Sequence, residues 1–334
     1  MSLTNKNKVI NRDVKTDVIR GFAIILMFFA HSAPYVENDS LNSNTLFRII
    51  CSLSAPLFLF LVGFNLKKGL TLPFLKKGLF ILVCAALIDL FVWDIVPFYS
   101  FDVLYLIGFS VVLFPLWSKM NTTFLTGFIL LILITAFVYQ GIGFYDYNLK
   151  EPTLSQLNDF SILTLTKNLF FDGWFPIFPW VSIVIFGYLV KNEAFRFNKL
   201  IYIGVISFLI GLFLIYLNQT AFLREFAVEV FYPFNYSYLL LSFGWIIIIF
   251  SLQLNYSSKI FIPLIKLGKS SLFLYAFHLS IYHVLFTQVF DLIDDFYIST
   301  LFFTLIYIGL AYLIDYIKYK YKIKHPLFNS IFGK

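Results

Sequence analysis

Charged residues are scarce in this chain. Of its 334 residues, 13% are charged and 60% are hydrophobic, and the mean hydropathy is +0.84. Because a water-facing surface needs more charge than this, a soluble enzyme, a nucleic-acid-binding protein and a disordered scaffold are excluded. The 44 Phe and 21 Tyr residues are acceptable where their neighbour is lipid. The composition therefore indicates an integral membrane protein.

Cysteines and several catalytic motifs are also scarce or missing. Cys51 and Cys84 each lie in an apolar run, so no disulfide framework is expected. The histidines come without carboxylates or thiols at ligand spacing, and we expect no metal. The sequence has neither a phosphate-binding Gly-rich loop with its Lys and Ser/Thr nor a Gly-x-Ser-x-Gly turn. ATP-driven transport and ordinary serine hydrolysis therefore lose support.

Long apolar runs fill most of the chain. A bilayer-spanning helix needs about 20 mostly apolar residues, and the predicted spans are residues 18–36, 46–66, 73–93, 101–118, 123–141, 174–190, 199–217, 236–254, 271–290 and 297–317. Pro56 in the second span, and Pro176 and Pro179 in the sixth, predict kinked or broken helices. The first run follows a basic stretch, but Pro34 stands where a signal peptide would be cleaved, so we expect a retained helix. The predicted fold is all-α, with about ten transmembrane helices in a single domain over residues 1–334.

The basic residues predict an orientation for these helices. Of the 25 Lys and Arg residues, 21 fall in alternate connections and the two tails, whereas 14 of the 18 acidic residues fall on the opposite side. Because Lys and Arg collect at the cytoplasmic face, both termini are predicted to be cytoplasmic, with basic tails at residues 1–17 and 318–334. This topology explains the net charge of +7, so the charge does not indicate a nucleic-acid partner. The longest outer connection, residues 142–173, is predicted to be an extracytoplasmic loop, either functional or disordered.

Two ionisable side chains lie on the first predicted helix. Arg20 and His31 are eleven residues apart, which places them on one helix face and roughly 16 Å apart along the axis. Ionisable groups inside a span are costly unless they face a cavity or a partner. The pair is therefore a candidate for an anion-binding group and an acid/base group on one inward-facing track. The alternative is that Arg20 lies at the membrane surface and His31 only hydrogen-bonds a neighbouring helix.

A polar stripe follows the ninth predicted helix. Ser271, Tyr275, His278 and Tyr282 recur at helical spacing, so they share a face that should contact protein. These groups either take part in function or join helices by hydrogen bonds. No internal repeat relates the two halves of the chain, which weakens the prediction of a secondary transporter.

Five segments carry a family resemblance: residues 17–31, 54–64, 101–108, 175–180 and 267–278. The first, Asp17-Val-Ile-Arg20-Gly21 followed by His31, resembles the Arg, ten residues, His signature of the transmembrane acyltransferases. That group includes the acyltransferase-3 family and bacterial relatives of heparan-α-glucosaminide N-acetyltransferase. The last three segments resemble the glucosaminide-acetyltransferase-like branch more closely.

The resemblance implies transfer of an acyl group, usually acetyl from acetyl-CoA, to a hydroxyl or amine of a carbohydrate or envelope molecule in a bacterial plasma membrane. It makes His31 the base or acyl carrier, with His278 as a second catalytic residue. The residues expected to bind acyl-CoA are Arg20, Lys269, Ser271 and Tyr275, because the two basic groups can pair with its phosphates. The residues expected to bind the acceptor are Asp172, Phe175 and Trp180; the alternative for these aromatic residues is the ordinary interfacial belt.

Two other functions use the same residues differently. A flippase or exporter of an envelope saccharide or small molecule would use the polar track as a pathway, without consuming a thioester. A non-catalytic scaffold for polysaccharide synthesis would not need His31, and the buried polar track disfavours it. The expected partners are therefore an acyl-CoA donor, a saccharide or other envelope acceptor and membrane lipid; a homo-oligomer is left open.

Overall fold

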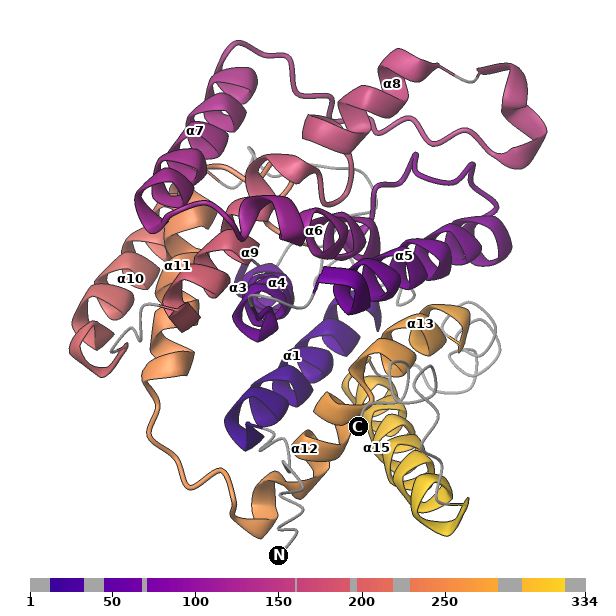
Figure 1. Cartoon of the computed structure of the whole chain (residues 1–334), viewed down its shortest axis with the longest axis vertical. Coiled ribbons are helices and arrows are strands. Elements are labelled where there is room, and N and C mark those ends of the chain that lie inside the picture. Colours follow the sequence, from indigo (N-terminus) through magenta and orange to yellow (C-terminus); the bar gives the residue numbers. More distant parts are fainter. Residues whose placement is uncertain are drawn as a thin grey trace, which may run out of the picture.

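A computed structural model describes residues 13–32, 45–67, 71–159, 161–192, 197–218, 229–281 and 296–321 (Figure 1). Helices dominate these ranges, and an isolated antiparallel bridge joins Ile95 to Thr153. The all-α prediction is therefore confirmed for the described part of the chain. The outer parts of both predicted basic tails, and Tyr282 of the polar stripe, lie outside the described residues.

Each of the ten predicted apolar segments contains helix. The first five hold α1 (Val14–Ser32), α3 (Thr45–Ser52) with α4 (Ser54–Asn65), α5 (Thr71–Ile88) with a π-helical turn (Asp89–Trp93), α6 (Val103–Trp117) and α7 (Thr122–Gly141). The last five hold α9 (Ile177–Asn192), α10 (Ile201–Leu217), α11 (Tyr236–Ser251), α13 (Ser271–Ile281) and α15 (Phe296–Tyr321). The short helix α12 (Ile262–Lys269) directly precedes α13.

Three described helices are long and apolar enough to cross a membrane: Thr45–Asn65, Thr122–Gly141 and Thr300–Tyr321. Two bent helix pairs would raise this number to five if each pair forms one span. They are Ile162–Asp172 with Ile177–Lys191, bent by 43°, and Lys259–Lys269 with Ser271–His278, bent by 67°. Helices α6, α10 and α11 are apolar but shorter. The number of spans, ten, and the cytoplasmic location of both termini therefore remain predictions.

Two of the prolines that predicted kinked or broken helices lie close to such breaks. α3 and α4 meet at Leu53, and Pro56 lies in the first turn of α4, where its missing N–H costs no intrahelical bond. In α9 the backbone leaves helical geometry at Phe178, because the residue before Pro179 disfavours the α conformation. Helical backbone also occurs within residues 142–173, which were predicted to be a loop. This segment contains a 3₁₀ helix (Leu154–Asp159), α8 (Ile162–Lys167) and a π-helical turn (Asn168–Asp172).

Helices α1 and α12 pack with their backbones in contact (Figure 1). A Cβ atom at Gly21 would lie 2.0 Å from the carbonyl oxygen of Leu264, and one at Gly268 would lie 2.0 Å from that of Asp17. Only glycine fits at such distances, and small residues of this kind are typical of helix interfaces in membranes. This contact fixes the Arg20 end of α1 against α12.

The outer helices present apolar side chains to their surroundings. On α10, for example, Tyr202 is 80% exposed and Phe213 61% exposed. A water-soluble protein rarely exposes a continuous apolar surface of this kind, whereas lipid accommodates it. The structure therefore agrees with a protein that lies in a membrane.

Candidate functional site

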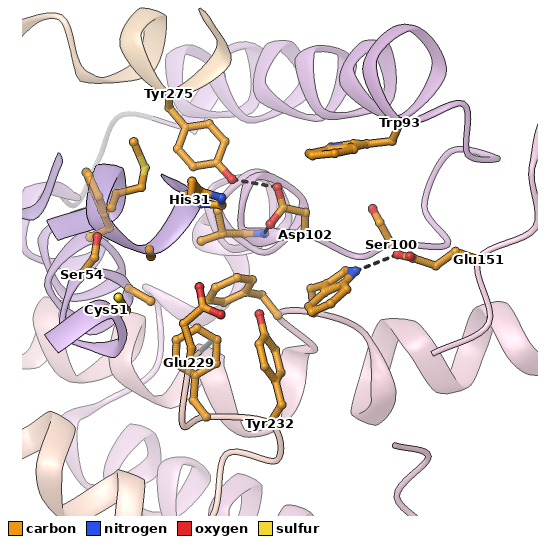
Figure 2. A pocket seen from close by; sticks show the side chains of 18 of the residues that line it. His31, Cys51, Ser54, Trp93, Ser100, Asp102, Glu151, Glu229, Tyr232 and Tyr275 are labelled. Atoms are coloured by element: carbon orange, nitrogen blue, oxygen red, sulfur yellow. Dashed lines mark hydrogen bonds between the residues drawn. The ribbon is translucent and has the colours of Figure 1, made fainter. Parts of the chain in front are cut away.

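A cavity of about 390 Å³ lies between the helices (Figure 2). Its helical walls come from α1, α3, α4, α6 and α13. Trp93, at the end of the π-helical turn after α5, and connecting segments with Glu151, Trp174, Glu229 and Tyr232 supply further parts of the wall. The volume falls in the range of small-ligand sites, roughly 300 to 1,000 Å³. Of the residues predicted to be functional, His31, Tyr275 and Phe175 line this cavity.

Two histidines meet at one end of the cavity. His31 is in the last turn of α1, and its ring contacts the ring of His278 edge-on, with centroids 4.9 Å apart and an interplanar angle of 66°. His278 is fully buried, and its Nδ1 atom contacts the carbonyl oxygen of Tyr275, one turn earlier on α13. His31 lines the cavity, and His278 packs on the side of its ring. The two predicted catalytic residues are thus brought together.

An aspartate that the sequence analysis did not select also lines this end of the cavity. Asp102 is the N-cap of α6, and its carboxylate accepts hydrogen bonds from the backbone N–H of Val103 (2.6 Å) and the hydroxyl of Tyr275 (2.7 Å). Figure 2 shows Asp102, Tyr275 and His31 gathered together. The signal available in the sequence was an acidic residue immediately before an apolar helix, which is typical of an N-cap. The hydrogen bond joins α6 to α13 beside the histidine pair.

A second aspartate holds the wall between α5 and α6. The buried carboxylate of Asp89 accepts hydrogen bonds from the hydroxyls of Tyr105 (2.6 Å) and Ser100 (2.9 Å) and from the backbone N–H of Phe98 (3.2 Å). The connection it holds contains three residues with positive φ, including Phe98 at 72°. Such conformations are unfavourable for bulky residues and persist where surrounding contacts impose them. Asp89 therefore stabilises the strained segment that carries Ser100 to the cavity.

Arg20 lies in the first half of α1 and is not among the described residues that line the cavity. Its Nη1 atom is 2.9 Å from a carboxylate oxygen of Asp17 and 3.2 Å from the carbonyl oxygen of Gly268. Asp17 and Arg20, three residues apart on α1, therefore form an ion pair. Lys269 and Ser271 lie at the bend between α12 and α13, next to Gly268. Arg20 thus lies close to the start of the bend that carries Lys269 and Ser271, whereas Tyr275 lines the cavity.

The predicted acceptor residues are divided between the cavity wall and the layer behind it. Phe175 lines the cavity. Trp180 is 1% exposed and packs edge-on against Phe231, with ring centroids 5.0 Å apart. Asp172 is 1% exposed and accepts a hydrogen bond from the hydroxyl of Tyr139 (3.0 Å). Among the described residues that line the cavity, neither Trp180 nor Asp172 occurs.

The cavity wall also contains aromatic and carboxylate side chains that sequence reasoning missed. The indole Nε1 of Trp174 donates a hydrogen bond to Oε1 of Glu151 (2.8 Å), and its ring meets the ring of Tyr232 edge-on, with centroids 5.0 Å apart. Glu229 lines the same cavity. These residues lie in connections between helices, where no periodic pattern points to a shared site. In the described ranges, no group of three or more His, Cys, Asp and Glu residues could hold a metal ion.

Comparison with known families identifies a relationship for the N-terminal part of the chain. The family described as heparan-alpha-glucosaminide N-acetyltransferase, catalytic, matches residues 12–202. This range includes Arg20, His31, Asp102 and Phe175, and it ends before α13. A search of curated proteins returned no significant match.

Proposed function

The chain belongs to the heparan-α-glucosaminide N-acetyltransferase catalytic family, whose model matches more than half of it, and on this premise we propose the following reaction. The protein transfers an acyl group, acetyl in the first instance, from cytoplasmic acyl-CoA to a hydroxyl or amine of a saccharide or other envelope acceptor. The observation that carries the proposal is the position of His31, which lines a central cavity and lies on the same helix as Arg20. The proposed location is the bacterial plasma membrane.

The donor is proposed to bind at the Arg20 end of α1. The guanidinium of Arg20 and the ammonium of Lys269 are close to the bend between α12 and α13, and both can pair with the phosphates of CoA. Arg20 and His31 are separated by about 16 Å along α1. The pantetheine arm would cover this separation and bring the thioester to His31. Ser271, at the start of α13, is proposed to contact the same arm.

The acceptor is proposed to occupy the cavity, on the other side of His31. In direct transfer, the neutral imidazole takes the proton of the acceptor hydroxyl or amine as that group attacks the thioester carbonyl. The C–S bond breaks, and the CoA thiolate leaves and is protonated. In the two-step variant, an imidazole nitrogen attacks the thioester first, CoA leaves, and the acceptor then displaces the imidazole from the acyl group. In both variants His278 holds the His31 ring from the side.

The proposed topology has ten spans with both termini cytoplasmic. It is supported by helix in each of the ten apolar segments and by the distribution of Lys and Arg along the sequence. In this orientation α1 runs outward, so Arg20 lies near the cytoplasmic face and His31 lies deeper. A cytoplasmic donor and an outer acceptor would then approach the same histidine from opposite sides.

The proposal is tested by measuring CoA release from radiolabelled acetyl-CoA by the purified protein, with a crude envelope fraction as acceptor. Wild-type protein is expected to release CoA, and His31→Ala is expected to lose about 100- to 10,000-fold in turnover, the usual contribution of a general base. Label retained on the wild-type protein without acceptor would support the two-step variant. Full turnover by His31→Ala would remove His31 from the mechanism, and transport of an acceptor without thioester consumption would favour the exporter.

A further inference from the structure

Tyr275 on α13 is held through both its side chain and its backbone. Its hydroxyl donates a hydrogen bond to the carboxylate of Asp102 (2.7 Å), and its carbonyl oxygen contacts Nδ1 of His278. The rings of Tyr275 and His278 also meet edge-on, with centroids 5.2 Å apart and an interplanar angle of 70°. Figure 2 shows the hydrogen bond to Asp102 beside His31. Tyr275 therefore connects α6 to the histidine pair.

Asp102 is a fixed point for this connection. Its carboxylate caps α6 by accepting a hydrogen bond from the backbone N–H of Val103 (2.6 Å). The residue before it is also held, because the carbonyl oxygen of Phe101 accepts a hydrogen bond from the backbone N–H of Phe175 (2.8 Å). A carboxylate on such a backbone loses little conformational entropy when it accepts a further hydrogen bond. Asp102 is thus suited to orient Tyr275.

Helix α13 follows a sharp bend, so its direction depends on contacts made beyond that bend. The helices on the two sides, Lys259–Lys269 and Ser271–His278, are bent by 67°. His278 lies about 12 Å along the helix from the bend, so a change of about 10° in the bend would move it by roughly 2 Å. The glycine contacts between α1 and α12 lie before the bend, whereas the hydrogen bond of Tyr275 to Asp102 lies beyond it. This hydrogen bond ties the far arm of the bend to α6.

The position of His278 matters because its ring packs against the proposed reacting group. The ring centroids of His278 and His31 are 4.9 Å apart, and His278 is fully buried. A shift of His278 therefore either displaces the ring of His31 or removes its lateral support. A misplacement of about 1 Å can cost about 100-fold in rate. The contacts that hold His278 are accordingly expected to affect turnover.

We propose that Asp102 and Tyr275 are positioning residues for acyl transfer, and that they act by holding His278 against His31. The inference rests on the proposed function, because it takes His31 as the reacting group, and it gives a role to Asp102. It also assigns Tyr275 to positioning, whereas the resemblance implied contact with acyl-CoA. The two assignments of Tyr275 differ in kinetics, because loss of a positioning residue lowers kcat and loss of a donor contact raises KM.

The kinetic test compares Tyr275→Phe, Asp102→Ala and Asp102→Asn with the wild type in phosphatidylcholine nanodiscs. We expect the first two to lower kcat about tenfold or more and to keep KM for acetyl-CoA within about twofold. Asn keeps hydrogen-bonding groups for both Val103 and Tyr275, so Asp102→Asn should keep kcat within about threefold of the wild type. Tyr139→Phe is the matched control. It deletes another Tyr–Asp hydrogen bond, to Asp172 (3.0 Å), at a residue outside the described cavity lining, and should keep the wild-type kcat.

Two kinetic outcomes would overturn the proposal. A raised KM with unchanged kcat in Tyr275→Phe would assign Tyr275 to donor binding. An equal loss of kcat in Asp102→Asn and Asp102→Ala would show that the carboxylate acts through its charge and not by positioning. Because Tyr275→Phe keeps the cap of α6, this variant tests the proposal even where Asp102→Ala does not fold.

A second measurement does not depend on acyl transfer. The full chain, with isotope-labelled histidine at its four histidine positions, is placed in the same nanodiscs for solid-state NMR. The spectrum reports a cross-peak between the rings of His31 and His278, each assigned by the loss of its signals on substitution. We expect the cross-peak in the wild type and in Tyr139→Phe, and loss of most of its intensity in Tyr275→Phe.

The two measurements separate failure of the inference from failure of the reaction. A cross-peak that weakens as expected, in a protein that never releases CoA, would keep the positioning of His31 and remove the proposed reaction. A protein that releases CoA, but whose Tyr275→Phe variant keeps both the cross-peak and kcat, would keep the reaction and overturn the inference.

Discussion

The ring of His31 meets the ring of His278 edge-on, with centroids 4.9 Å apart, although the two residues lie near opposite ends of the sequence. The contact is made possible by α12, which packs against α1 through Gly21 and Gly268 and leads directly into α13. The position of the proposed catalytic histidine thus depends on a helix outside the segment that matches the family.

Replacing His278 with Phe should reduce turnover without abolishing it. Phe keeps a ring beside His31 but loses the contact of Nδ1 with the carbonyl oxygen of Tyr275. Because small displacements of a reacting group are costly, we expect kcat to fall roughly 10- to 100-fold while KM for acetyl-CoA is kept. Steady-state kinetics over a range of pH measure this effect. An unchanged kcat would show that His278 does not position His31 for the reaction.

Replacing Arg20 with Ala should weaken donor binding. If the guanidinium pairs with CoA phosphate, its loss should raise KM for acetyl-CoA about tenfold or more, since hydrogen bonds to charged groups are strong. The measurement compares acetyl-CoA with S-acetylpantetheine, a thioester donor without phosphates. The variant should be impaired with the first donor and close to wild type with the second. Equal impairment with both donors would instead assign Arg20 to packing against Asp17 and α12.

The hydrogen bond between Tyr275 and Asp102 should stabilise the protein. Tyr275→Phe deletes the donor with little change of shape, and Asp102→Asn keeps an acceptor while removing the charge. We expect Tyr275→Phe to lower the free energy of unfolding by about 1 kcal/mol, within the range of hydrogen bonds between membrane helices. A double-mutant cycle, read by denaturant unfolding of the purified protein, isolates the pair. Strictly additive effects of the two substitutions would show that the hydrogen bond contributes nothing.

The proposed orientation can be tested with single cysteines. In a chain with Cys51 and Cys84 replaced by Ala, Tyr147→Cys should react with a membrane-impermeant maleimide added to intact cells. Lys119→Cys should react only after the cells are permeabilised. Both positions are exposed, so a difference in labelling reports the side of the membrane and not burial. The reverse pattern would invert the topology, and with it the assignment of donor and acceptor faces.

The helices were predictable from the sequence because apolar runs of the right length leave few alternatives. The common face of Arg20 and His31 followed from helix periodicity alone. Contacts between distant segments were not predictable in this way. Glu151, Trp174 and Glu229 lie in connections, and their meeting at one cavity depends on how the helices pack.

The expected acceptor residues show what a resemblance and aromatic character leave open. Trp180 was expected to contact the acceptor, and the structure packs it among other rings behind the cavity wall. Trp174, only a few residues earlier, is in the wall itself. In a chain with 44 Phe and 21 Tyr residues, aromatic character alone cannot distinguish residues that line the cavity from residues that pack behind them.

The residues at the cavity lie partly on packed helices and partly in the connections between helices. This difference has an evolutionary consequence. His31, His278 and Tyr275 are fixed on packed helices, whereas Glu151, Trp174, Glu229 and Tyr232 lie in connections, which tolerate substitution better than helix interfaces. Under the proposed function, changes in these connections would let related proteins use new acceptors while the histidine pair stays as it is. Sequence differences that accompany a change of substrate would then lie in the connections between the helices.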